Sequence, residues 1–183
     1  MVDLKAVRQR MEKAVEVVRQ EFATVRTGKA TPTLLDVVKV EAYGTTLPIQ
    51  QVAQVTAPEP RLLVVQPFDR GLIGAIERAI RESDLGLNPM NDGKVIRVPV
   101  PPLTEERRRE LARVLHKMAE EGRVAVRRVR HDANEEIKRL QKERQLSEDD
   151  ARRLFDEVQK LTDRYIEKID ELLERKEAEV MEV

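Results

Sequence analysis

The sequence predicts an α+β protein made of a long three-helix bundle and a small inserted α/β domain. Apolar residues repeat at steps of three and four residues before residue 27 and after residue 103. Between these segments, residues 33–103 contain eight of the nine prolines and several short β-branched runs. No amphipathic helix can bury its stripe alone, so we expect the first segment to pack with the last two.

The first helix is expected over residues 1–26. Gly28 and Pro32 follow it, which is a usual way for a helix to end. Its predicted apolar stripe consists of Leu4, Val7, Met11, Ala14, Val18, Phe22 and Val25.

The inserted domain should hold short strands and one helix. The β-branched runs predict strands at 34–40, 52–56, 62–66 and 95–98, separated by glycine and proline turns. Asp69 is a candidate N-cap for a helix that ends near Ser83 and faces Ile76 and Ile80 inward.

The central helix is expected from Thr104 to Arg144, or about 60 Å at 1.5 Å per residue. Pro101 and Pro102 prevent an earlier start, and Thr104 is a suitable N-cap. Its predicted apolar stripe consists of Leu111, Leu115, Met118, Gly122, Ala125, Val129, Ala133, Glu136 or Ile137, and Leu140.

The opposite side of this helix is rich in arginine. At 100° per residue, five arginines fall within a sector of about 100°. They are Arg109, Arg113, Arg123, Arg127 and Arg130. Arginine outnumbers lysine here, and guanidinium groups suit phosphate. Arg127 has no acidic residue three or four positions away, so a face consisting only of internal salt bridges fits poorly.

Ser147 is the expected N-cap of the last helix, which must be antiparallel to the central one because the turn is short. The predicted bundle therefore comprises 1–28 and 104–183, and the inserted domain comprises 33–100. Residues 29–32 and 101–103 would form a hinge of two linkers. The predicted hinge residues are Gly28, Lys29, Pro32, Pro101, Pro102 and Thr104.

Overall charge hides a strong local asymmetry. The chain carries 34 basic and 34 acidic side chains, but residues 104–144 carry 13 and 9, a net charge of +4. Residues 145–183 carry 7 and 13, a net charge of −6. Binding to phosphates depends on the local potential, so RNA binding fits this helix despite the neutral total.

Other features argue against catalysis, a cofactor and a membrane span. The two histidines, His116 and His131, project about 60° apart and cannot share a metal ion, so we expect no metal site. The acidic clusters lie at positions typical of helix surfaces and helix N-termini, and there is no cysteine. No apolar run reaches 18 residues, so we expect no membrane span and a cytoplasmic location. We also expect a monomer.

Five stretches resemble the bacterial ribosome recycling factor family. They are Arg26–Pro32 (RTGKATP), Ser83–Pro89 (SDLGLNP), Pro101–Arg108 (PPLTEERR), Gly122–Arg127 (GRVAVR) and Gln159–Asp163 (QKLTD). The resemblance extends over the whole chain with its spacings intact. It implies an L of two arms, a three-helix bundle and a small α/β domain joined by a flexible elbow.

The resemblance also implies a function in translation after termination. Such a factor is not an enzyme. It binds the large ribosomal subunit through ribosomal RNA, and elongation factor G with GTP then drives the subunits apart. The family motif V-R-N-x-R-R-[DE] matches Val126, Arg127, Arg130 and Asp132, and Arg130 matches the arginine on which the family's ribosome binding depends. Two positions depart from the motif, Arg128 (usually Asn) and His131 (usually Arg).

Two alternatives remain open from the residues alone. One is a structural or chaperone-like coiled-coil protein, which would form oligomers through an exposed apolar seam. The other is an enzyme, although the sequence contains no catalytic arrangement that supports it.

Overall fold

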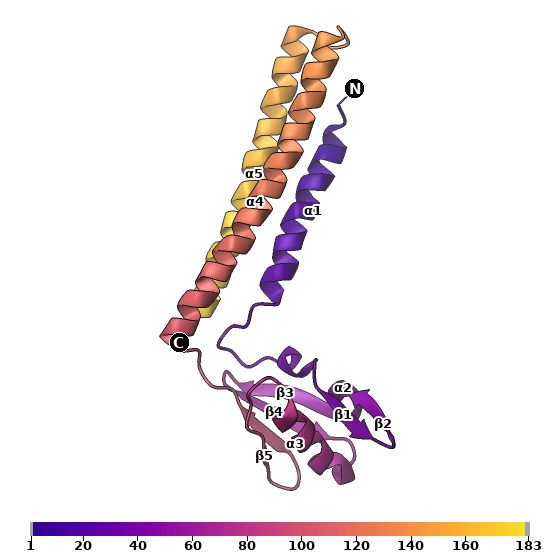
Figure 1. The fold of residues 1–183 in the computed structure, drawn as a ribbon, viewed down its shortest axis with the longest axis vertical. Helices are drawn as coiled ribbons and strands as arrows, with labels where there is room; N and C mark the ends of the chain where they lie inside the picture. The colour runs from indigo at the N-terminus through magenta and orange to yellow at the C-terminus, as the bar shows by residue number, and fades with distance from the viewer. Residues whose placement is uncertain (1, 182–183) are drawn as a thin grey trace. The chain divides into compact units, whose positions relative to one another are not determined.

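A computed structural model describes residues 2–181, and the chain divides into two compact units (Figure 1). One unit combines the N-terminal segment up to Thr27 with the C-terminal segment from Thr104. The other unit is the intervening segment, Gly28–Leu103. The first unit is helical and the second contains all the strands of the described residues, so the predicted α+β class is confirmed.

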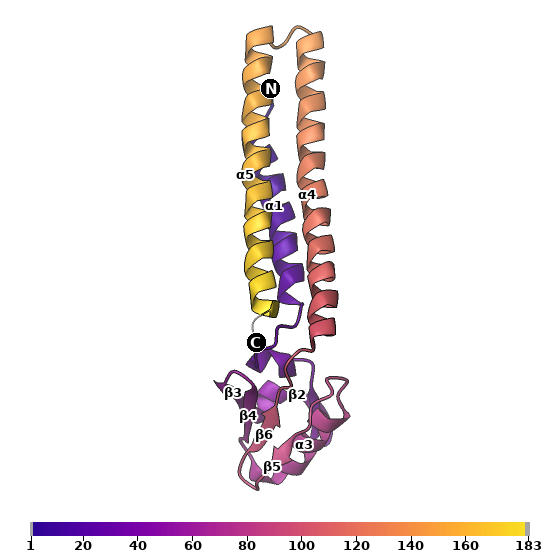
Figure 2. The ribbon, with the colours of Figure 1, turned by 90° about the vertical axis from the view of Figure 1, so that its left-hand side faces the viewer.

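The helical unit is a bundle of α1 (Leu4–Ala23), α4 (Glu105–Lys142) and α5 (Glu148–Met181). Helices α4 and α5 run antiparallel, and α1 lies along both of them (Figures 1 and 2). Each helix starts at a side-chain cap. The Thr104 hydroxyl accepts a hydrogen bond from the Arg107 backbone N–H at 3.1 Å, and the Ser147 hydroxyl accepts one from Asp150 at 3.0 Å. Asp3 caps α1 in the same way.

The buried stripe of α4 is shifted by one residue from the prediction at two places. Ala119 and Val126 are fully buried, whereas the predicted Met118 and Ala125 are half-buried. A helix that packs against two partners buries a wider stripe than a helix that packs against one. Either of two neighbouring positions can therefore lie at the centre of the stripe. The same shift occurs on α1, where Val15 is buried and the predicted Ala14 is half-buried.

Gly122 lies where α1 and α5 both approach α4 closely. A Cβ atom at this position would lie 2.2 Å from Val18 Cγ2 on α1 and 3.3 Å from Ile169 Cδ1 on α5. Both neighbours are buried, and a valine side chain has little freedom to move aside. Only glycine therefore fits this crossing.

The inserted unit contains two antiparallel sheets. Its four-stranded sheet has the order β3-β4-β6-β5, and its two-stranded sheet pairs β1 with β2. The strands are β1 (Lys39–Ala42), β2 (Thr45–Pro48), β3 (Ala53–Glu59), β4 (Leu62–Pro67), β5 (Met90–Asn91) and β6 (Ile96–Pro99). The helices are η1 (Pro32–Leu35), α2 (Ile49–Val52), η2 (Arg70–Leu72) and α3 (Ile73–Glu82).

The predicted strand at 34–40 is wrong for residues 34–38. Pro32 is the first residue of a short 3-10 helix, η1, and the strand begins only at Lys39. Strand β2 was not predicted, and it is joined to β1 by a turn at Tyr43 and Gly44. Both residues have positive φ, 52° and 77°, as a two-residue hairpin turn requires.

The inserted unit has its own core. Ile76 and Ile80 on α3 are completely buried, as predicted, together with Leu63 and Val65 on β4 and Ile96 on β6. Asp69 caps the start of the helical segment by accepting a hydrogen bond from the Gly71 backbone at 2.9 Å. The two units therefore each bury a separate set of apolar side chains.

Candidate nucleic-acid interface

The five predicted arginines form two groups along α4. Arg109 and Arg113 lie near its start and are exposed. The other three lie in the middle of the helix and point along the side next to α5. We call this group the arginine edge: Arg123, Arg127 and Arg130. About 15 Å of helix separates the two groups.

Arg123 is a cross-link between α4 and α5. Its Nε and Nη2 atoms lie 2.8 and 2.7 Å from Asp170 Oδ1, and its Nη1 atom lies 3.0 Å from Glu120 Oε2. The side chain is only 18% exposed. Burial lowers the pKa of Arg123, but hydrogen bonds to Asp170 and Glu120 outweigh burial and leave the pKa above its ordinary value. Two carboxylates therefore neutralise this arginine.

Arg127 also has a carboxylate partner, contrary to the expectation from sequence spacing. Its Nη1 atom lies 3.0 Å from Glu120 Oε1, seven residues earlier on the same side of the helix. Glu120 thus holds one arginine with each oxygen. Hydrogen bonds from Arg127 and then Arg123 lower the pKa of Glu120. Arg127 is 42% exposed, so its pairing with Glu120 stays in contact with solvent.

Arg130 differs from its two neighbours. Its Nη1 atom lies 3.4 Å from the amide oxygen of Gln159 on α5, and no carboxylate of residues 2–181 forms an ion pair with it. Gln159 in turn donates from Nε2 to Asp163 Oδ1 at 2.8 Å. The Arg130 guanidinium therefore contacts a neutral group, and no ion pair within residues 2–181 offsets its positive charge.

The N-terminal pair has a more acidic setting. Arg109 Nη2 lies 2.7 Å from Glu105 Oε1. Glu106 and Glu110 line the same shallow surface hollow as Arg109 and Arg113. This end of α4 is consequently less positive than the five arginines alone suggested.

Three further residues of the motif are not part of the arginine edge. Arg128 and His131 are exposed; Arg128 projects from α4 at about 100° from Arg127, whereas His131 projects at about 40° and borders the edge. Asp132 forms an ion pair with Arg10 of α1 at 3.0 Å. Its position in the motif therefore serves contact between helices.

The two predicted linkers contact the inserted unit at one turn. Ala30 N–H donates to Pro60 O at 2.6 Å, and Val100 N–H donates to Arg61 O at 2.8 Å. Both residues are buried, and Pro32 already belongs to η1. The remaining predicted hinge residues lie on the other side of these two anchors: Gly28, Lys29, Pro101, Pro102 and Thr104.

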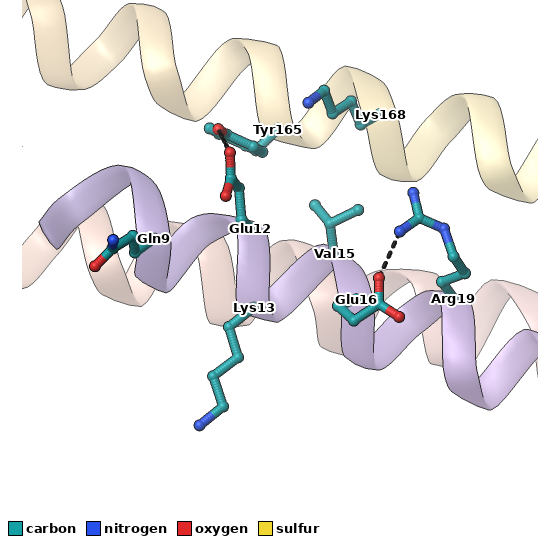
Figure 3. Close-up of a pocket in the computed structure, with 8 residues that line it drawn as sticks. All are labelled: Gln9, Glu12, Lys13, Val15, Glu16, Arg19, Tyr165 and Lys168. Atoms are coloured by element: carbon teal, nitrogen blue, oxygen red, sulfur yellow. Dashed lines mark hydrogen bonds and ion pairs between the residues drawn. The ribbon is translucent and has the colours of Figure 1, made fainter. Parts of the chain in front are cut away.

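A second hollow lies between α1 and α5, and Figure 3 shows its lining. The Tyr165 hydroxyl donates to Glu12 Oε1 at 2.9 Å, and Lys168 Nζ lies 4.7 Å from the centre of the tyrosine ring. Burial and the hydrogen bond to Glu12 raise the pKa of Tyr165. Acidic and basic side chains alternate around the opening, so these contacts join two helices and do not form a basic surface.

Among residues 2–181, no three histidine, cysteine, aspartate or glutamate side chains gather closely enough to hold a metal ion. His116 contacts Glu177 on α5. Within the same range, no helix combines the length and the apolarity needed to cross a membrane.

Comparison with known proteins identifies the chain's relatives. The family model described as ribosome recycling factor matches residues 18–181. The ribosome-recycling factor of Rubrobacter xylanophilus is 61% identical over 183 residues, which are 100% of this chain and 98% of the relative. That of Symbiobacterium thermophilum is 59% identical over 180 residues, covering 98% and 97% of the two chains.

Solved structures agree with these relatives. A solution structure of the ribosome recycling factor has a TM-score of 0.71 at 49% identity and covers 98% of this chain and 95% of that one. A second structure has a TM-score of 0.61 at 50% identity over 98% and 97% of the two chains. It belongs to models of the T. thermophilus ribosome recycling factor and E. coli elongation factor G bound to the E. coli post-termination complex. The chain therefore belongs to the ribosome recycling factor family.

Proposed function

We propose that this protein recycles ribosomes by binding the large subunit of the post-termination complex through the arginines of α4. Elongation factor G, with GTP, would then drive the two subunits apart for another round of translation. The partners follow from the similar structure, which describes a ribosome recycling factor and elongation factor G on a post-termination complex. The protein itself would catalyse no reaction, and it would act in the cytoplasm.

The observation that carries this proposal is the uncompensated charge of Arg130. A guanidinium contacted only by a neutral amide can bind an RNA phosphate without first losing a carboxylate partner. Arg127 supports it from one turn away, because its exposed ion pair with Glu120 is weak enough to exchange. Arg123 would support the surface by holding α4 against α5, while Arg109 and Arg113 would extend it toward the start of α4.

The hinge would lie between the anchored residues and the bundle. Ala30 and Val100 are both tied to the turn at Pro60 and Arg61, so they should move with the inserted unit. Bending should therefore concentrate at residues 27–29 and 101–104, closer to the bundle than the predicted segments 29–32 and 101–103. Two short linkers beside one turn would favour rotation about a single axis.

We also propose that the protein acts as a monomer. The apolar stripes of α1, α4 and α5 are buried against one another within one chain. A coiled-coil protein that assembles through its helices would need one of these stripes for its partner.

Substitution of Arg130 with alanine tests the proposal. We expect Arg130→Ala to weaken binding to isolated large subunits about tenfold. It should also lower the slope of log affinity against log salt by about one, because one phosphate contact is lost. Arg19→Ala on α1 is the matched control, since it removes the same charge from an exposed ion pair elsewhere in the bundle.

Subunit splitting with elongation factor G and GTP provides the functional readout. The wild-type protein should split post-termination ribosomes, and Arg130→Ala should need a higher concentration for the same yield. Equal affinities and equal salt slopes for the wild type and Arg130→Ala would remove Arg130 from the interface. Absence of splitting by the wild type with a matched elongation factor G would overturn the proposed function.

A further inference from the structure

We propose that Gln159 holds the Arg130 side chain in position to bind RNA. The kind of partner, amide or carboxylate, decides which arginines of the edge carry a positive charge that no ion pair offsets. Gln159 supplies an amide to Arg130, whereas Glu120 supplies a carboxylate to Arg127. The inference rests on the proposed function, in which Arg130 contacts ribosomal RNA.

The orientation of the Gln159 amide follows from its second hydrogen bond. Its nitrogen donates to Asp163 Oδ1 at 2.8 Å, so its oxygen is the atom that faces Arg130, at 3.4 Å from Nη1. An amide offers donors on one side and an acceptor on the other. Gln159 can therefore bridge a carboxylate and a guanidinium that do not form an ion pair with each other.

This bridge gives Asp163 a hydrogen-bond partner other than an arginine of the edge. Asp163 lies one helical turn after Gln159 on α5 and uses Oδ1 to accept from the amide. If position 159 carried a carboxylate, Arg130 would gain an acidic partner comparable to those of its neighbours. The isosteric change from glutamine to glutamate adds this charge, and it also removes the donor to Asp163.

Arg123 and Arg127 show what a carboxylate partner does on the same surface. Asp170 and Glu120 contact Arg123 at 2.7 and 3.0 Å, and Glu120 contacts Arg127 at 3.0 Å. Such a carboxylate competes with an RNA phosphate for the guanidinium and offsets the charge that attracts the phosphate. Arg130 forms no such ion pair within residues 2–181, and the Gln159 contact occupies only one of the five N–H donors of a guanidinium.

The positioning has a geometric part and an electrostatic part. A single contact from α5 limits the directions that the flexible Arg130 side chain can take, which reduces the entropy lost on binding. The neutral character of that contact preserves the attraction for phosphate. The two parts are separable, because leucine at position 159 removes the contact without adding a charge.

Isosteric exchanges at the two partner positions test the inference. We expect Gln159→Glu to weaken binding to large subunits about tenfold and to lower the salt slope by about one. Gln159→Leu should weaken binding about two- to threefold with an unchanged slope. Glu120→Gln should tighten binding about two- to fivefold and steepen the slope, because Arg127 loses its competing carboxylate.

Each outcome separates this inference from the proposed function. If Arg130→Ala weakens binding but Gln159→Glu changes neither affinity nor salt slope, the role of Gln159 is wrong while the RNA contact stands. If Gln159→Glu and Gln159→Leu lose affinity equally at the wild-type slope, the partner's charge has no part in the effect. If Arg130→Ala itself binds normally, the proposed interface fails.

Thermal unfolding by circular dichroism controls for folding of all variants. Should Gln159→Glu unfold, Glu120→Gln still tests the inference, since it removes only an exposed carboxylate. Wild-type affinity and wild-type slope for Glu120→Gln would then overturn it.

Discussion

The helical bundle and the inserted sheet unit differ in whether one helix contributes to both the core and the candidate interface. In the bundle, α4 contributes to both, because Gly122 is packed between Val18 and Ile169 while the next residue, Arg123, begins the arginine edge. In the inserted unit, the core of α3 and the four-stranded sheet is separate from this surface. A packing error in the bundle should therefore reach the candidate interface, whereas one in the insert should leave it intact.

The largest expected effect breaks the bundle side of this comparison. Gly122→Leu should lower the free energy of unfolding by about 4 kcal/mol, above the usual cost of an inserted side chain, since even its Cβ would clash with Val18. Binding to large subunits should fall in parallel because α4 can no longer pack against α1 and α5. Chemical denaturation followed by circular dichroism, together with sedimentation with large subunits, measures both.

Gly74→Ala is the matched control for this substitution. Gly74 lies in α3, and no heavy atom lies within 4 Å of an added Cβ. Alanine should therefore stabilise the helix by up to about 1 kcal/mol. A stable, fully binding Gly122→Leu protein would show that the close approach at this crossing is not required.

A cavity in the insert should separate stability from binding. Ile76→Ala removes a completely buried side chain from α3 and should cost about 3 kcal/mol of unfolding free energy. Affinity for large subunits should stay at the wild-type value, because the arginine edge belongs to the other unit. A loss of affinity equal to that of Arg130→Ala would contradict the separation of the two cores.

The smallest effect concerns the charge pairing of Glu120. Its hydrogen bonds with Arg127 and Arg123 lower its pKa, so the pairing is present at neutral pH and is lost as the pH falls through that lowered pKa. Arg127→Ala should move the pKa of Glu120 back toward its ordinary value, and Arg123→Ala should move it less. Carbon-13 NMR titration of the carboxyl group measures the shift, and an unchanged pKa in Arg127→Ala would disprove the contact.

The fold followed largely from local patterns in the chain. Steps of three and four apolar residues located the three helices, and Thr104 and Ser147 marked two of their starts. The one-residue errors at Met118 and Ala125 arose because a helix with two partners buries a wide stripe. The hairpin of β1 and β2 was missed because its second strand is half-exposed and largely polar, and thus has no clear apolar alternation.

The candidate site was only partly accessible from sequence. The five arginines share a helix face by periodicity alone, and the resemblance singled out Arg130. Glu120, the partner of Arg127, lies seven positions away, outside the spacings of three and four that helix neighbours usually have. The long side chains of arginine and glutamate can meet across two turns.

The sequence by itself determined the helices, their caps, the discontinuous order of the bundle and the family. Each of these depends on residues close together in the chain or on motifs with fixed spacing. Only the tertiary structure decided which arginines carry free charge, because Asp170 and Gln159 reach the edge from a different helix. Electrostatic partners across a helix interface depend on the register between helices, and no local periodicity contains that register.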